Sequence, residues 1–259
     1  MVYVSIIGCG NMGSALAEGL SKAGGYSVTA CDLDPDARDR VADYCEETTD
    51  DPAAATAGAD IVVVAVKPDI VGPVLDSIDL SPEQTLVSFA AGVRREYVQA
   101  RTDATVVRVM PNIAAAYGDM AAAAVADDLT DEVREMLAAV GSFVEVDESL
   151  MDIATAVNGS GPAFVFYLLE AMKDAGIESG LDPEQAEVLA AQTFKGAGEI
   201  VLQDDRSVDE LIDAVCSPNG TTIEGMKVLR ASDADTAVMD AVEAARKRSV
   251  ELAEEFRDD

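Results

Sequence analysis

The chain has 259 residues, and its 49 acidic against 18 basic side chains give a formal net charge of −31, so it repels nucleic acid and anionic membrane surfaces. It contains no histidine, which excludes imidazole-based hydrolytic triads, histidine-bound zinc and dehydrogenation assisted by histidine. Hydrophobic residues make up 49% of the chain, enough for a full core, yet no apolar stretch reaches the roughly 18 residues of a membrane span.

The first predicted element is a strand that runs straight into a glycine-rich turn. Residues 2–7 are β-branched and apolar, and GCGNMG from Gly8 to Gly13 follows and leads into a predicted helix. In a G-x-G-x-x-G turn Gly8 allows the tight turn, Gly10 lets a pyrophosphate approach the backbone, and Gly13 lets helix and strand pack closely. The helix N-terminus adds free N–H groups for phosphate. The motif predicts a nicotinamide or flavin nucleotide, and the alternative is a βα turn without a ligand.

Strands and helices alternate through the rest of the first half, which is typical of a doubly wound parallel sheet. The strand predicted at residues 60–66 is continuously apolar from Ile61 onward, which indicates that it is buried on both faces. Further strands are predicted at 28–31, 85–89, 105–110, 121–126 and 143–146, with helices at 35–45, 51–57, 69–77, 94–100 and 130–140.

After about residue 147 the strand patterns stop and only helical patterns remain. Helices are predicted at 150–157, 162–179, 183–203, 208–215, 223–229 and 234–256. The expected architecture is α/β: a Rossmann-type doubly wound domain over residues 1–148, followed by an all-helical domain over residues 149–259.

Three strand ends in the first half are candidates for cofactor contacts, because ligands of open α/β sheets lie beyond the carboxyl ends of the strands. The alternatives are a strand stopped by Pro68 with Lys67 at the surface, and a plain turn at Asn112. The candidate residues are Ala65, Val66, Lys67, Pro68, Phe89, Ala90, Ala91 and Asn112.

Asp32 bears on the choice of cofactor. It ends the second predicted strand, 19 residues after Gly13, where an acid commonly accepts a hydrogen bond from a ribose 2′-hydroxyl and repels a 2′-phosphate. That position favours NADH. NADPH stays open, since acids are abundant in this chain and Arg38 is placed to approach a phosphate.

Two glycine-containing loops of the helical half are candidates for binding an anionic substrate. The first holds Ser160 between two glycines, and the second runs from Cys216 to Thr222. Backbone N–H groups in such loops bind carboxylates. The alternative for the second loop is an ordinary helix start, with Thr221 or Thr222 as the N-cap of a helix beginning at Ile223.

The motifs GCGNMG, AVKP, AAG, RVMPN, NGSGPAF, LAAQTFKGAGE and SPNGTT follow one another from Gly8 to beyond Thr222. In this order, and over nearly the whole chain, they resemble the Δ1-pyrroline-5-carboxylate reductase family. The resemblance implies reduction of Δ1-pyrroline-5-carboxylate to L-proline by NAD(P)H, the last step of proline biosynthesis. It also implies a homodimer or higher homo-oligomer formed through the C-terminal helices, with the active site at the interface between the domains.

The resemblance assigns roles to individual residues. Thr222 would hydrogen-bond the substrate ring nitrogen as the catalytic residue, Gly220 and Thr221 would help to hold its carboxylate, and Glu148 matches an acidic position near the pocket. Residues 65–68 and 89–91 would line the cofactor. The pyrophosphate would be held by Gly8, Gly10, Asn11, Met12 and Gly13. The chain departs from the family pattern at Ile113-Ala114, at Phe164 and at Asn219, where Thr-Pro, Tyr and Gly are usual.

This chemistry is compatible with a chain that lacks histidine. If the substrate enters as an iminium, no protein group has to donate a proton, and catalysis comes from holding the hydride donor and the acceptor about 3–3.5 Å apart. Three rivals stay open: an imine reductase, a β-hydroxyacid dehydrogenase, and a non-catalytic dinucleotide sensor.

The remaining expectations concern environment and metals. An acidic surface is screened at high salt, which predicts a protein of a halophile. The four cysteines show no C-x-x-C pair, and residues 2–7 read as a strand rather than a secretion signal. We therefore expect reduced thiols in a cytoplasmic protein, with no metal site.

Overall fold

The computed structural model describes residues 1–127 and 129–255, and they form two compact units. The first unit consists of residues 1–160 together with the chain from Val242 onward, and the second of residues 161–241. Each unit is described by itself.

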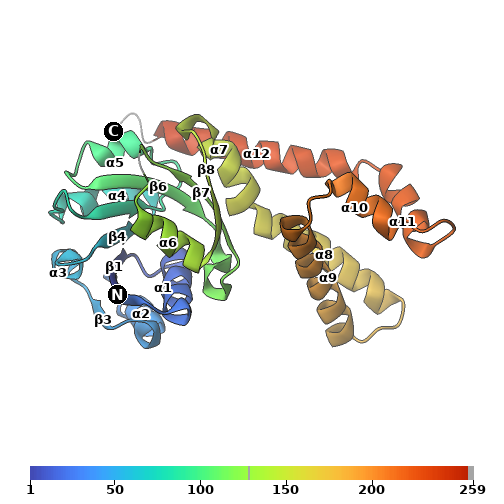
Figure 1. The fold of residues 1–259 in the computed structure, drawn as a ribbon, viewed down its shortest axis with the longest axis horizontal. Coiled ribbons are helices and arrows are strands. Elements are labelled where there is room, and N and C mark those ends of the chain that lie inside the picture. The colour runs from blue at the N-terminus through green and yellow to red at the C-terminus, as the bar shows by residue number, and fades with distance from the viewer. Residues whose placement is uncertain (128, 256–259) are drawn as a thin grey trace. The chain divides into compact units, whose positions relative to one another are not determined.

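The first unit is built on one eight-stranded sheet of order β3-β2-β1-β4-β5-β6-β7-β8 (Figure 1). Strands β1 to β6 are parallel, β7 is antiparallel to β6, and β8 is parallel to β7. The order 3-2-1-4-5-6 is that of dinucleotide-binding doubly wound sheets, so the predicted fold class is confirmed. The strands are β1 (Val2–Ile7), β2 (Tyr26–Cys31), β3 (Glu47–Thr49), β4 (Ile61–Val64), β5 (Thr85–Ser88), β6 (Thr105–Pro111), β7 (Met120–Val125) and β8 (Gly141–Glu145).

Helices cover both faces of this sheet, and each buries its apolar stripe against the strands. Leu16 and Leu20 of α1 share a core with Met136 and Leu137 of α6, whereas α3, α4 and α5 pack on the other face. The helices are α1 (Asn11–Ala23), α2 (Pro35–Val41), α3 (Pro52–Thr56), α4 (Pro68–Asp76), α5 (Arg95–Gln99) and α6 (Asp131–Ala139), with 3-10 helices η1 (Ala42–Tyr44) and η2 (Ile113–Tyr117).

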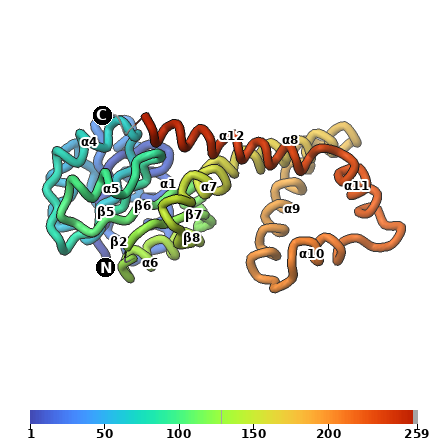
Figure 2. Tube along the Cα trace, turned by 90° about the horizontal axis from the view of Figure 1, so that it is seen from above, coloured from blue at the N-terminus to red at the C-terminus, as the bar shows by residue number. Residues whose placement is uncertain are grey.

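The chain after β8 is helical throughout its described part, as predicted. Figure 2 shows α7 beside β7 and β8 in the first unit. None of the helices over the described residues is long and apolar enough to cross a membrane. The elements are the 3-10 helix η3 (Glu148–Leu150), α7 (Met151–Ala154), the π-helix η4 (Thr155–Gly159), α8 (Gly161–Glu178), α9 (Pro183–Gln203), α10 (Val208–Val215), α11 (Thr221–Arg230) and α12 (Ala234–Glu255).

Several predicted elements differ from the structure in their limits. The helix predicted at 35–45 is shorter and ends in η1, and the short strand β3 has no counterpart in the prediction because its Glu-Thr-Thr sequence carries no apolar alternation. The helix predicted at 223–229 begins two residues earlier, at Thr221. Residue 256, the predicted end of the last helix, lies outside the described residues.

The compact units also differ from the predicted division at residue 148. Residues 148–160 belong to the first unit because their polar side chains bond to the sheet, and the end of α12 belongs there because Leu252 and Ala253 pack on Gly92. The split into residues 1–148 and 149–259 stays a prediction about functional halves.

Candidate dinucleotide and substrate sites

The glycine turn between β1 and α1 is packed too tightly for side chains at two of its three glycines. Gly8 has a φ of +100°, in the left-handed region, and a Cβ there would lie 2.6 Å from the carbonyl oxygen of Ala65. A Cβ on Gly13 would lie 1.8 Å from the carbonyl oxygen of Gly8. A Cβ on Gly10 would meet no heavy atom within 4 Å, so open space lies beside this residue. These are the three conditions that a pyrophosphate-binding turn requires.

The N-terminus of α1 faces this turn without a cap from the protein. Its N-cap is Gly10, which has no side chain to accept a hydrogen bond, and no acid lies in its first turn. In contrast, side chains cap α2, α3 and α6, through Asp34, Asp51 and Thr130. The first N–H groups of a helix have no partner within the helix. Those at the start of α1 fit the phosphates of a dinucleotide.

The ends of β1, β4 and β5 meet at the same edge of the sheet. The N–H of Ala65 donates to the carbonyl of Ile7 at 2.8 Å, and the N–H of Phe89 to that of Val64 at 2.9 Å. The structure therefore places Ala65 and Val66 beside the glycine turn, and residues 89–91 follow β5 at the same edge, one strand further along the sheet. Phe89 and Ala90 are buried, so any contact of these two residues with a ligand comes from their backbone, whereas Ala91 is partly exposed.

Asp32 is tied to the glycine turn by its side chain. Its Oδ2 accepts the N–H of Cys9 at 2.7 Å, and its Oδ1 accepts the N–H of Asp34 at 2.9 Å. Arg38 donates through Nη1 to the main-chain carbonyl of Asp32 at 2.6 Å. The carboxylate is therefore held in a fixed position at the end of β2.

Cys9 lies within this turn, but it is not a reactive thiol. It is buried, and burial together with the nearby Asp32 carboxylate raises the pKa of Cys9 to about 12. The thiolate is the nucleophilic form, so this cysteine stays neutral near pH 7. Burial likewise raises the pKa of Cys31 and of Cys45 to about 11.

Asn112 follows β6 and caps the helix η2. Its Oδ1 accepts the N–H of Ala114 at 3.1 Å and that of Ala121 at 3.3 Å. The amide oxygen of Asn112 is therefore used within the turn, as the alternative interpretation of this residue expects. A contact between its amide nitrogen and the cofactor stays a prediction.

Glu148 forms an ion pair that the sequence analysis did not anticipate. Nη1 of Arg108 donates to Oε1 of Glu148, and Arg108 is only 3% exposed within β6. Removing one partner of such a pair leaves a buried charge without compensation, so the pair fixes Glu148 to the sheet. The signal was available, because a lone charge inside the apolar run VVRVM of a buried strand needs a partner.

Ser160 ends the π-helix η4, in place of the loop expected there. Its N–H donates to the carbonyl of Thr155 at 3.1 Å, and α8 follows directly from Gly161. Single π-turns occur often at functional sites. The role of Ser160 in substrate binding stays a prediction.

The second candidate loop leads into α11, and the alternative of a threonine N-cap is wrong. Gly220 is the N-cap, no side chain caps the helix, and Thr221 and Thr222 are its first two residues. Their N–H groups have no acceptor within the helix and are therefore suited to a carboxylate. Gly220 was expected to hold the substrate carboxylate through its backbone N–H, but this N–H donates to the carbonyl of Ser217 at 3.0 Å.

The backbone conformation at Asn219 explains why asparagine can replace the glycine that is usual in the family at this position. It has a φ of 61°, the only positive φ of a non-glycine residue in the described part of the chain. Glycine adopts this left-handed conformation freely, and asparagine tolerates it better than most residues do. The turn before Thr221 is therefore formed with asparagine in place of glycine.

The predicted residues thus divide between the units. The glycine turn, the strand ends, Asp32, Asn112, Glu148 and Ser160 lie in the first unit, and Gly220, Thr221 and Thr222 lie in the second. Among the described residues, no group of three or more cysteine or acidic side chains is arranged to hold a metal ion.

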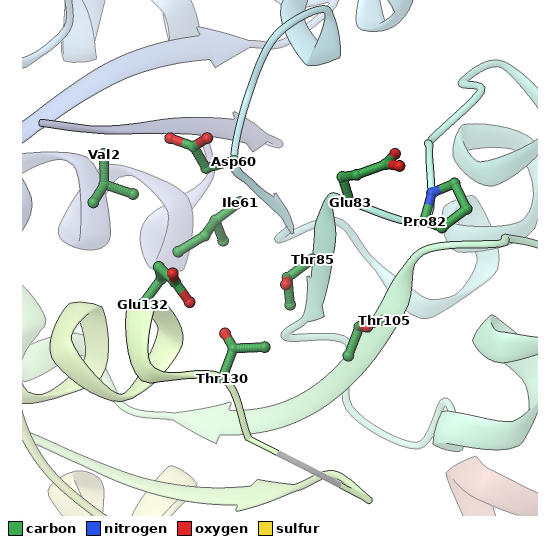
Figure 3. A pocket seen from close by; sticks show the side chains of 9 residues that line it. All are labelled: Val2, Asp60, Ile61, Pro82, Glu83, Thr85, Thr105, Thr130 and Glu132. Atoms are coloured by element: carbon green, nitrogen blue, oxygen red, sulfur yellow. The ribbon is translucent and has the colours of Figure 1, made fainter.

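A cavity of about 450 Å³ in the first unit lies at the opposite edge of the sheet (Figure 3). It is lined by residues that begin strands, among them Val2, Ile61, Thr85 and Thr105. Ligands of open α/β sheets lie at the carboxyl ends, so this cavity is not the dinucleotide site.

Both halves of the chain match known families. Residues 148–252 match a family described as pyrroline-5-carboxylate reductase dimerisation, and residues 3–92 match one described as NADP oxidoreductase, coenzyme F420-dependent.

Relatives match over nearly their full length. The chain is 40% identical to the pyrroline-5-carboxylate reductase of Methanosarcina acetivorans, over 96% of this chain and 97% of the relative. It is 37% identical to that of Pseudomonas aeruginosa, over 98% and 97%. The crystal structure of Plasmodium falciparum pyrroline carboxylate reductase with NADP bound superposes with a TM-score of 0.83 at 30% identity, over 97% of this chain and 98% of that one.

Proposed function

Because the chain belongs to the pyrroline-5-carboxylate reductase family, we propose that it reduces Δ1-pyrroline-5-carboxylate to L-proline with NAD(P)H. The observation that carries this proposal is the start of α11, where the family motif SP-x-GTT forms an uncapped helix N-terminus with Thr222 in its first turn. An uncapped N-terminus binds the carboxylate of such a substrate, and a threonine hydroxyl hydrogen-bonds its ring nitrogen.

The residues of the chain bind and orient rather than transfer protons. The glycine turn and the first N–H groups of α1 hold the pyrophosphate, and the segments after β4 and β5 line the nicotinamide half. Thr221 and Thr222 hold the substrate through their N–H groups, and the hydroxyl of Thr222 fixes the orientation of the ring. The bound dinucleotide supplies the hydride. Holding the two reactants in position is sufficient for a large rate enhancement.

The proposal is tested by following the nicotinamide absorbance of NADH or NADPH after addition of Δ1-pyrroline-5-carboxylate. We expect oxidation of the cofactor and formation of proline. Turnover only with other cyclic imines or with 3-hydroxy acids would favour the related reductases. Cofactor binding without turnover of any of these substrates would favour a dinucleotide sensor.

For the cofactor we propose a preference for NADH over NADPH. The carboxylate of Asp32 is held in place by the N–H groups of Cys9 and Asp34 and cannot swing away from an incoming 2′-phosphate. In this position it repels the phosphate and accepts from a ribose hydroxyl.

We predict that Asp32→Ser shifts the ratio of kcat/KM for NADPH to that for NADH upward by roughly tenfold, since one close like-charge repulsion is removed. Glu18→Gln, which removes one half-buried acid of α1 that pairs with Lys22, is the matched control and should leave the ratio unchanged. An unchanged ratio in the Asp32 variant would show that the preference has another source.

We further propose that the second unit forms a homodimer or higher homo-oligomer through its helices. Only Ala186 and Ala190 are fully buried within α8 to α11, whereas large apolar side chains stay exposed, with Tyr167 at 77% and Leu202 at 75%. Monomeric proteins rarely expose so much apolar surface. The match of residues 148–252 to a dimerisation family supports a second copy of this chain as the partner.

The charge supports a protein adapted to high salt, and the buried free thiols Cys9 and Cys31 support a reducing, cytoplasmic setting.

We predict that the Tm rises with KCl up to about 1 M and then levels off, because the Debye length has by then fallen to ~3 Å. Thermal unfolding followed by circular dichroism at stepped KCl concentrations measures this. A Tm that climbs without levelling would indicate salting-out instead of screening.

A further inference from the structure

The π-helix η4, which precedes the predicted substrate residue Ser160, is attached to the sheet by one side chain. Nδ2 of Asn158 donates to the carbonyl oxygen of Met110 at 2.7 Å and to that of Ala121 at 3.0 Å. Both partners are carbonyl oxygens, so the atom facing them has to be the amide nitrogen, which fixes the orientation of the amide. One side chain thereby uses both of its N–H donors on two different strands, β6 and β7.

The predicted cofactor residue Asn112 directly follows β6, in the connection from β6 to β7. Its Oδ1 accepts the N–H of Ala121, the residue whose carbonyl receives Asn158. The N–H of Ala121 is thus bonded to Asn112, and its carbonyl is bonded to Asn158. Through Ala121 the two asparagines connect the segment after β6 with the segment before Ser160. All of these residues belong to the first unit.

We propose that Asn158 is a positioning residue for the reaction, which fixes the turn around Ser160 relative to the carboxyl edge of the sheet. The inference rests on the proposed function. The amide suits this role because its planar NH₂ group spans two carbonyls, which neither a hydroxyl nor a carboxylate does. Displacing a binding group by about 1 Å is enough to cost a large factor in turnover.

The test replaces Asn158 by aspartate, which has the same shape but directs oxygen toward the two carbonyl oxygens, and also by alanine, in case the aspartate variant does not fold. We expect the KM for Δ1-pyrroline-5-carboxylate to rise roughly tenfold or more in either variant. The dissociation constant of the reduced cofactor, titrated by its fluorescence in the absence of substrate, should change less than about twofold, since its phosphates bind at α1.

Ser249→Ala provides the matched control. Ser249 lies on α12 and donates through Oγ to Oδ1 of Asp152 at 2.7 Å, a second tie of the segment 148–160 that lies away from Ser160. The loss of this hydrogen bond in Ser249→Ala should lower the Tm about as much as the Asn158 substitutions do and leave the KM unchanged. An equal KM in wild type and in both Asn158 variants would overturn the inference, as would a KM that rises equally in the Ser249 variant.

Hydrogen exchange separates this inference from the proposed function. The amides of residues 155–161 should exchange roughly tenfold faster in the Asn158 variants than in wild type, whatever the substrate. Failure of the wild-type protein to reduce Δ1-pyrroline-5-carboxylate would overturn the proposed function. Unchanged exchange of this segment would overturn the role of Asn158 even in an active enzyme.

Discussion

Replacing Thr222 by valine is expected to lower kcat about a hundredfold, the usual cost of removing one hydrogen bond that orients and stabilises the reacting group. Valine keeps the shape of threonine and removes only the hydroxyl. Thr222 is the second residue of α11, and no hydrogen bond from its hydroxyl caps the helix, so the loss should leave the helix intact. Steady-state rates at saturating substrate measure the effect.

Two measurements distinguish this role from a general disturbance of α11. Thr222→Ser restores the hydroxyl and should recover most of the wild-type rate. The affinity of the Thr222→Val variant for the dinucleotide should stay within about twofold of wild type, because the proposed phosphate site is at α1, in the other unit. Wild-type turnover of the valine variant would refute the assignment of Thr222.

The glycine turn offers a second large effect, because alanine should destabilise the protein at Gly13 and leave its stability unchanged at Gly10. Gly13→Ala should lower the free energy of unfolding by about 3 kcal/mol or more, because the new Cβ would lie 1.8 Å from the carbonyl oxygen of Gly8 and force the turn apart. Gly10→Ala should leave the unfolding free energy unchanged within about 0.5 kcal/mol, since its Cβ meets no atom.

Cofactor binding should respond at Gly10 even though stability does not. The open space beside Gly10 is where we propose that the pyrophosphate approaches the backbone, so a methyl group there should raise the dissociation constant of the dinucleotide roughly tenfold or more. Denaturant titration measures the free energy of unfolding, and cofactor fluorescence measures the dissociation constant. If Gly10→Ala bound the dinucleotide as tightly as wild type, the phosphates would have to lie elsewhere.

The sheet and the dinucleotide half of the site were predictable because they depend on local patterns. Buried parallel strands are continuous apolar runs, and the turn from Gly8 to Gly13 specifies its own geometry, so the fold class and the neighbourhood of residues 65–68 and 89–91 follow from the sequence. The start of α11 was misplaced because threonine is both a good N-cap and an acceptable first helical residue.

Contacts between distant segments could not be predicted in the same way. The pairing of Arg108 with Glu148 and the bonds of Asn158 to Met110 and Ala121 join residues 37 to 48 positions apart. The charge of Arg108 inside an apolar strand indicated that some acidic partner was needed, but it did not identify Glu148 as that partner. Residues 149–160 were therefore assigned to the helical half, although they belong to the same compact unit as the sheet.

The nearly coreless state of α8 to α11 links the integrity of the chain to its concentration. If these helices gain their core only by pairing with a second copy, mass action governs their folding, and each tenfold dilution lowers the apparent stability of the pair by about 1.4 kcal/mol. Specific activity would then fall on dilution although every chain remained chemically intact, and it would recover when the sample is concentrated again.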